Sequence, residues 1–296
     1  MFKMSEYSFV AAALCLGLAS LLYLAYAVSG LRAGRLQAAG TSFGTSTSFT
    51  FAGSPMTREL GRYASIIGWL ALGTLTASLI FRTIYTQHGP FSNMYEFSVA
   101  FAWGILAAYY WFERKYGQRI LAVVALPVAL GMLLYAVTIP STVEPLVPAL
   151  QNNLLLTVHV AVAIVAYGSF TVGFGAALLY LIQPEEGRGN LPKPKILEEI
   201  GYRSIVIGFP FLTLTVILGA VWADVAWGKY WSWDPKETAS LVTWLIYATF
   251  LHARVVRGWR GKRAAWLLVL GFAATLFTYF GNLFFGGLHS YAGLGQ

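Results

Sequence analysis

Long apolar stretches separated by short polar segments run along the whole chain. Eight of them lie at residues 8–31, 63–85, 95–112, 119–138, 153–182, 204–222, 238–257 and 264–285. Each is on the order of the 20 residues that a helix needs to cross a bilayer. The longest connection, Arg32–Arg62, is rich in Ser, Thr and Gly, which is typical of a flexible loop. The pattern predicts an all-α integral membrane protein with about eight transmembrane helices: a first helix and loop over residues 1–62, and a transmembrane domain over 63–296.

Composition and charge support this prediction and add an orientation. The chain is 57% hydrophobic and 11% charged, whereas soluble domains carry about 25% charged residues. If the N-terminus is outside, the loops at 32–62, 113–119, 183–203 and 254–263 are cytoplasmic and hold sixteen of the twenty Lys and Arg residues. Because positive charge favours the cytoplasmic side, we expect both termini to be extracytoplasmic. The net charge of +8 therefore indicates topology and does not indicate nucleic-acid binding.

Cysteine usage excludes two classes of protein. Cys15, in the first apolar stretch, is the single cysteine of the chain. A CxxC redox pair and a haem-attaching CxxCH are therefore both impossible, so the chain is neither a thiol oxidoreductase nor a c-type cytochrome.

The AYA triplet at Ala25–Ala27 resembles a signal-peptidase site, but cleavage there would invert every later loop, so we expect the first stretch to remain a transmembrane helix.

The segment 222–237 is unusually rich in tryptophan and is predicted to lie outside. It carries four of the ten tryptophans, at positions 222, 227, 231 and 233. Aromatic belts at membrane interfaces explain one or two of them. The cluster is also a platform for a flat aromatic ligand with an anionic edge, such as a porphyrin, and a quaternary amine is a further alternative. The sequence Asp234-Pro235-Lys236-Glu237 predicts a helix start with Asp234 as N-cap.

Histidine is scarce, and its positions matter. His159, His289 and His88 are predicted at the outer level of the tryptophans, and His252 lies fifteen residues after Glu237, roughly 22 Å deeper. Two outer histidines beside a tryptophan platform suggest two axial ligands for haem iron, and His252 would then belong to a second, intramembrane haem position. A buried histidine bonded to a neighbour is the alternative. Lys229, Lys236 and Arg82 are candidate partners for propionates by their side and charge.

The residues WGKYWSWDPKE followed by TASLVTWLIYATFLHAR resemble the tryptophan-rich WWD motif of the haem-handling superfamily of CcmC, CcmF and the CcsA/ResC proteins. The DPKE ending and the downstream LHAR are most similar to CcsA/ResC of System II cytochrome c biogenesis. Gln87–Phe97, QHGPFSNMYEF, is similar to an outer loop of that family. Here His88 precedes Gly89 instead of following a glycine, so His88 stays outside the ligand set. The resemblance runs from about residue 60 to the C-terminus.

The resemblance implies a haem-handling subunit of a membrane cytochrome c synthetase that presents haem b at an external site for attachment to CxxCH of apocytochrome c. It implies a CcsB/ResB-like membrane partner, an external thiol-reducing protein and a location in the bacterial cytoplasmic membrane with an extracytoplasmic site. The site residues that it implies are the iron ligands His159, His289 and His252, the packing residues Trp227, Trp231 and Trp233, and Asp234.

Three rival functions remain open at this stage. A haem exporter or chaperone differs from a synthetase subunit only in the last step. A membrane cytochrome b would pair histidines across helices at matching depths, and His252 has no such mate in the sequence. A transporter or receptor for an organic cation would bind no haem.

Overall fold

The computed structural model describes residues 1–40, 55–143, 150, 153–183, 191–281 and 284–289. These ranges contain eight α-helices and one short 3-10 turn, and no strand lies among the residues described. The helices are α1 Phe2–Gly40, α2 Pro55–Thr86, α3 Met94–Tyr116, α4 Ala122–Val137 (preceded by the 3-10 turn Arg119–Leu121), α5 Asn153–Leu181, α6 Pro194–Trp227, α7 Pro235–Val255 and α8 Lys262–Phe280.

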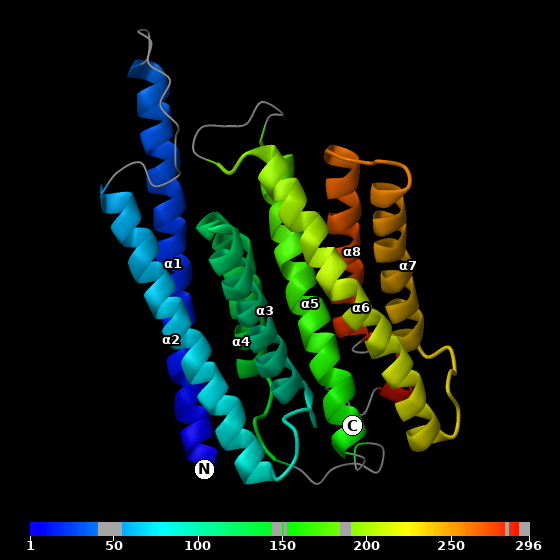
Figure 1. The fold of residues 1–296 in the computed structure, drawn as a ribbon. Helices are drawn as coiled ribbons and strands as arrows, with labels where there is room; N and C mark the ends of the chain where they lie inside the picture. Colours follow the sequence, from blue (N-terminus) through cyan, green and yellow to red (C-terminus); the bar gives the residue numbers. More distant parts are fainter. Residues whose placement is uncertain (41–54, 144–149, 151–152, 184–190, 282–283, 290–296) are drawn as a thin grey trace.

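The helices form a flattened bundle of antiparallel neighbours (Figure 1). Helices that follow one another pair as α1 with α2, α3 with α4, α5 with α6 and α7 with α8, and α5 also contacts α3 and α8. Glycines allow the closest of these approaches: a Cβ added at Gly168 of α5 would lie 2.5 Å from the carbonyl oxygen of Gly104 on α3. Small residues that let backbones meet are typical of helix packing in membranes.

The positions of the helices agree with the apolar stretches of the sequence. Six helical segments, in α1, α2, the 3-10 turn with α4, α5, α6 and α8, are long and apolar enough to cross a membrane. Large apolar side chains cover the outside, for example Leu14 at 70% and Leu21 at 66% exposure, as expected for a surface in contact with lipid. The all-α, multi-pass membrane prediction is confirmed. Helices α3 and α7 are more polar, so the total of eight spans stays a prediction.

Helix α6 differs from its predicted extent in a way that changes the tryptophan segment. The apolar stretch ends near residue 222, but the helix continues to Trp227, where Gly228 ends it in the left-handed conformation with φ of 71°. No helix-breaking residue stands between the two positions. The predicted loop 222–237 therefore consists of the last turns of α6, a short connection and the first turn of α7.

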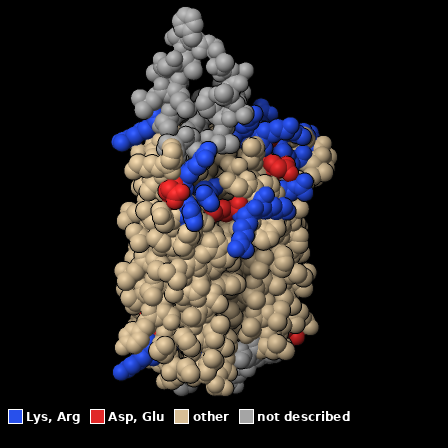
Figure 2. All heavy atoms as spheres, turned by 60° about the vertical axis from the view of Figure 1, so that its left-hand side comes forward, with Lys and Arg blue, Asp and Glu red and all other residues tan. Residues whose placement is uncertain are grey.

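Basic residues gather at one end of the bundle, where α3 ends, α6 begins and the α7–α8 connection lies (Figure 2). The start of α1 and the end of α8 lie at the opposite end (Figure 1). One buried cation lies away from the basic end: Arg82, at the last turns of α2, pairs with Glu96 of α3 at 2.8 Å and donates to the Ser141 carbonyl at 2.8 Å.

Candidate functional site

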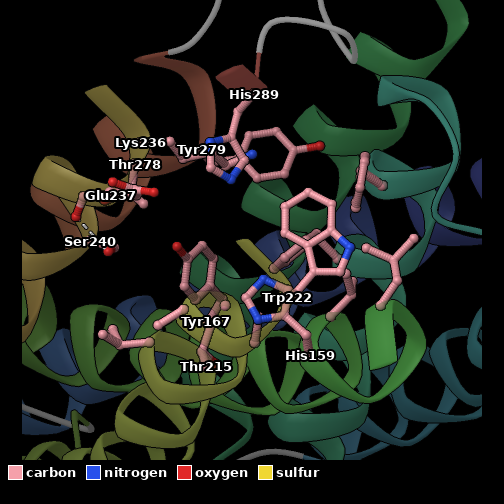
Figure 3. Close-up of a pocket in the computed structure, with 18 of the residues that line it drawn as sticks. His159, Tyr167, Thr215, Trp222, Lys236, Glu237, Ser240, Thr278, Tyr279 and His289 are labelled. Atoms are coloured by element: carbon pink, nitrogen blue, oxygen red, sulfur yellow. Dashed lines mark hydrogen bonds between the residues drawn. The ribbon is translucent and has the colours of Figure 1, made fainter. Parts of the chain in front are cut away.

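A large cavity opens at the end of the bundle opposite the basic residues. The empty space between its lining residues amounts to about 960 Å³, a figure that includes the part open to the surroundings. Residues of α3, α5, α6, α7 and α8 line it together with Tyr230, Trp231 and His289. Most of the lining is aromatic or aliphatic, which suits a broad apolar ligand. Figure 3 shows His159 and His289 at opposite sides of this space, with Trp222 beside it.

His159 reaches the cavity from the second turn of α5. Its ring stacks on Trp222, with centroids 6.4 Å apart and planes 12° from parallel. Gly219 of α6 makes room for the ring, because a Cβ there would lie 2.9 Å from the imidazole Cε1. The Nδ1 atom is buried and has no hydrogen-bond partner in the described chain. A buried ring nitrogen without a partner is costly unless a ligand satisfies it.

His289 reaches the same cavity from the segment after α8. Its Nδ1 lies 2.9 Å from Oδ1 of Asp234, and its ring packs on Trp222 and Trp227 with centroid distances of 5.8 and 5.0 Å. A neutral imidazole that donates Nδ1–H to a carboxylate carries its lone pair on Nε2. This carboxylate–histidine arrangement orients histidines that bind metals.

Asp234 has two tasks at the start of α7. Its Oδ1 accepts the backbone N–H of Lys236 at 2.9 Å, while Glu237 accepts the backbone N–H of Asp234 at 3.2 Å. The predicted helix start with Asp234 as N-cap is thus confirmed, and Glu237 completes a capping box. The same Oδ1 also bonds His289, so the helix start and the histidine orientation depend on one carboxylate.

The pKa values of this pair fit a charged aspartate and a neutral histidine. Burial alone would raise the pKa of Asp234, but the hydrogen bond and charge of His289 and the backbone N–H groups of Lys236 and Leu288 outweigh it and lower the pKa to about 2. Burial lowers the pKa of His289 below 6.5, Lys236 adds to this effect, and Asp234 opposes it. At neutral pH the imidazole is therefore available as a ligand.

The other residues predicted from the sequence lie in different places. Trp231 lines the cavity. Trp227 stands behind it, against Trp222 and His289. Trp233 is 69% exposed, has a φ of 59° and contacts Trp231 edge-on. His252 is exposed near the basic end of α7, and His88 bonds the Gly89 carbonyl outside the cavity lining.

Sequence reasoning missed most of the cavity lining, including two residues that lie against the histidine rings. Trp222 is 2% exposed and touches both histidine rings. Its place in the tryptophan cluster was visible, but the face of α6 that it occupies depends on packing against α5. Gly219 carried no signal beyond a glycine in an apolar helix.

The imidazoles of His159 and His289 fit an iron ion whose other four ligands are the nitrogens of a porphyrin. No group of three or more His, Cys, Asp or Glu side chains that would bind a bare metal ion occurs in the part of the chain that the structure describes. Two imidazoles at opposite sides of an apolar cavity suit the axial positions of a porphyrin iron.

The fold and the cavity define a multi-pass membrane protein with an aromatic site at one end, and comparison with known proteins identifies its family. The family model described as Cytochrome C assembly protein matches residues 91–289, a range that ends at His289. A relative from Gloeobacter violaceus named Cytochrome c biogenesis protein CcsA is 37% identical, and the similarity covers 81% of this chain and 88% of the relative. A relative of the same name from Guillardia theta is 38% identical, with 78% of this chain and 85% of the relative covered.

The chain therefore belongs to the cytochrome c assembly protein family, among the CcsA proteins of cytochrome c biogenesis. A solved structure named Cytochrome c Heme Lyase CcmF shares the fold, with a TM-score of 0.56 and 22% identity. The similarity covers 91% of this chain and 46% of that one, so this chain corresponds to about half of the CcmF chain.

Proposed function

We propose that this chain holds haem b in its cavity, with His159 and His289 as the axial ligands, and presents it for covalent attachment to the CxxCH motif of apocytochrome c. The observation that carries this proposal is the convergence of two histidines from α5 and the segment after α8 on one aromatic cavity. Family membership supports it, because cytochrome c biogenesis requires haem and an apocytochrome.

The residues of the chain supply position, and the substrates supply the reactive groups. Asp234 fixes the His289 ring, Gly219 leaves room for the His159 ring, and Trp222 and Trp231 form apolar walls. Each cysteine thiol adds across one vinyl group: sulfur bonds one carbon, the proton goes to the other, and nothing is oxidised or released. Holding the reactants in register is a large share of catalysis for such additions.

The thiols must arrive reduced. The one cysteine of this chain, Cys15, is half-buried in α1, so we assign the reduction to an external thiol-reducing protein.

We further propose that a CcsB/ResB-like membrane subunit packs on this chain near His252, whose side chain is exposed on α7. His252 would be a ligand of a second, intramembrane haem position, with its mate on that subunit. The location proposed is the bacterial cytoplasmic membrane, with the cavity on the extracytoplasmic side.

A maturation assay tests this function. The chain is produced with its partner subunit and a CxxCH apocytochrome, and covalent haem is read as haem stain on a denaturing gel. We expect His159→Ala and His289→Ala to abolish covalent haem and added imidazole to restore part of it. His88→Ala is the matched control, since His88 lies outside the cavity lining. Normal maturation in either cavity variant without imidazole would refute the assignment.

A further inference from the structure

Lys236 brings a positive charge into a cavity whose lining is mostly aromatic and aliphatic and also includes Glu237. Lys236 is the second residue of α7, is half-buried and lines the cavity together with Thr278 and His289; Figure 3 shows it on the side where Glu237 and Thr278 also lie. Its ammonium stands 5.8 Å from the centre of the Phe97 ring. Within the described ranges, Lys236 forms no salt bridge with a carboxylate.

Two acidic side chains lie near Lys236, and neither forms a salt bridge with it among the described residues. Oδ2 of Asp234 is buried without a hydrogen-bond partner there, while the other carboxylate oxygens have partners of their own. Oδ1 of Asp234 is engaged by His289 and by the Lys236 backbone N–H. Glu237 accepts the backbone N–H groups of Ser232 and Asp234 and the Ser232 hydroxyl. These carboxylates serve the helix start and the histidine. A cation that forms no salt bridge with these carboxylates in a low-dielectric cavity favours an anionic ligand.

The other two candidate cations on this side of the bundle do not compete for that role. Arg82 lies between α2 and α3, paired with Glu96 at 2.8 Å, and is absent from the cavity lining. Lys229 is exposed in the connection between α6 and α7 and does not line the cavity either. Of the three, Lys236 is the one that a ligand between His159 and His289 can meet.

We infer that Lys236 binds a carboxylate of the porphyrin and so fixes which edge of the ring faces α7. This inference rests on the proposed function and adds the orientation of its substrate. Haem carries its two propionates at one edge and its vinyl groups away from that edge. With a propionate at Lys236, the vinyl groups point away from α7. The lysine thereby determines the side of the cavity at which an incoming thiol must arrive.

A binding experiment with iron-free porphyrins isolates the carboxylate from the iron. The full chain, purified in detergent, is titrated with protoporphyrin IX and with its dimethyl ester, and binding is read from quenching of tryptophan fluorescence. The variants are Lys236→Met and, as a matched control, Lys229→Met. The ester has the same ring and vinyl groups without the negative charges. Comparing the acid-to-ester affinity ratio between variants cancels the different partition of the two probes into detergent.

For wild type and Lys229→Met we expect the free acid to bind about 10- to 100-fold more tightly than the ester, which is the range for a hydrogen bond to a charged group. Lys236→Met should bind both probes with the affinity of the ester, and Lys236→Arg should recover part of the preference. If Lys236→Met lowered the affinity for both porphyrins equally, or for neither, the inference about Lys236 would be overturned. The proposed function would not be affected by that result. Failure of wild type to bind either porphyrin and also ferric haem would overturn the proposed function as well.

Discussion

At the scale of single residues, the candidate site depends on contacts between positions far apart in the sequence. Asp234 and His289 are separated by 55 positions, yet they meet at 2.9 Å. The sequence was sufficient to predict Asp234 as an N-cap, because that role depends on the next three residues. Its contact with His289 could not be predicted, because it requires the segment after α8 to fold back over the start of α7.

Replacing Asp234 by Ser separates its two tasks. Serine caps a helix about as well as aspartate, but it is too short to reach the His289 ring. We expect Asp234→Ser to bind haem about 10- to 100-fold more weakly, the usual cost of losing the partner that orients a metal-binding histidine. The measurements are haem titration and thermal unfolding of the purified chain. Asp234→Asn, which keeps the acceptor oxygen and loses the charge, should lie between Ser and wild type. Wild-type affinity in the Ser variant would contradict the orienting role.

At the scale of helices, the contact between α5 and α6 sets the position of His159. The length of the apolar stretches predicted the two helices but not which faces meet, because a helix that is apolar on all sides gives no preferred face. The structure places Gly219 and Trp222 of α6 against His159 of α5. The tryptophan that lies between the histidines is thus a helical residue, whereas Trp233, grouped with it in the sequence, lies on the exposed surface.

Gly219→Ala tests this contact. The added methyl group would lie 2.9 Å from the His159 ring, so the ring or α6 must shift. Overpacking of this kind costs about 1–3 kcal/mol, and we expect haem affinity to fall by about tenfold or more while the helices still form. Gly73→Ala is the control, because a Cβ at Gly73 meets nothing within 4 Å. Haem titration of both variants gives the comparison, and equal affinities would show that the glycine is not required.

At the scale of the whole molecule, basic residues gather at one end of the bundle (Figure 2). The cavity lies toward the other end, between the first turns of α5 and α7 and the last turns of α6 and α8. The length of the apolar stretches and the distribution of Lys and Arg between the loops follow from residue order alone. For that reason the sequence was sufficient to predict a helical membrane protein and its orientation. The cavity arises only when α3, α5, α6, α7 and α8 come together, so its shape was outside the reach of the sequence.

The orientation predicts which loops face the cytoplasm. In a Cys15→Ser background, Lys229→Cys should react with a membrane-impermeant maleimide on intact spheroplasts, and Arg257→Cys should react only after the membrane is opened. Both side chains are exposed, so accessibility within the protein is matched. The reverse labelling pattern would place the cavity on the cytoplasmic side.

The central claim is that His159 and His289 are the two axial ligands of one haem. Low-temperature electron paramagnetic resonance of the chain purified with its partner subunit and loaded with ferric haem tests it most directly, because spin state reports the number of strong axial ligands. A His252→Ala background removes the signal of a second haem position. The account predicts a low-spin signal in that background, converted to high-spin by either His159→Ala or His289→Ala and restored by added imidazole. An unchanged low-spin signal in both variants would contradict it.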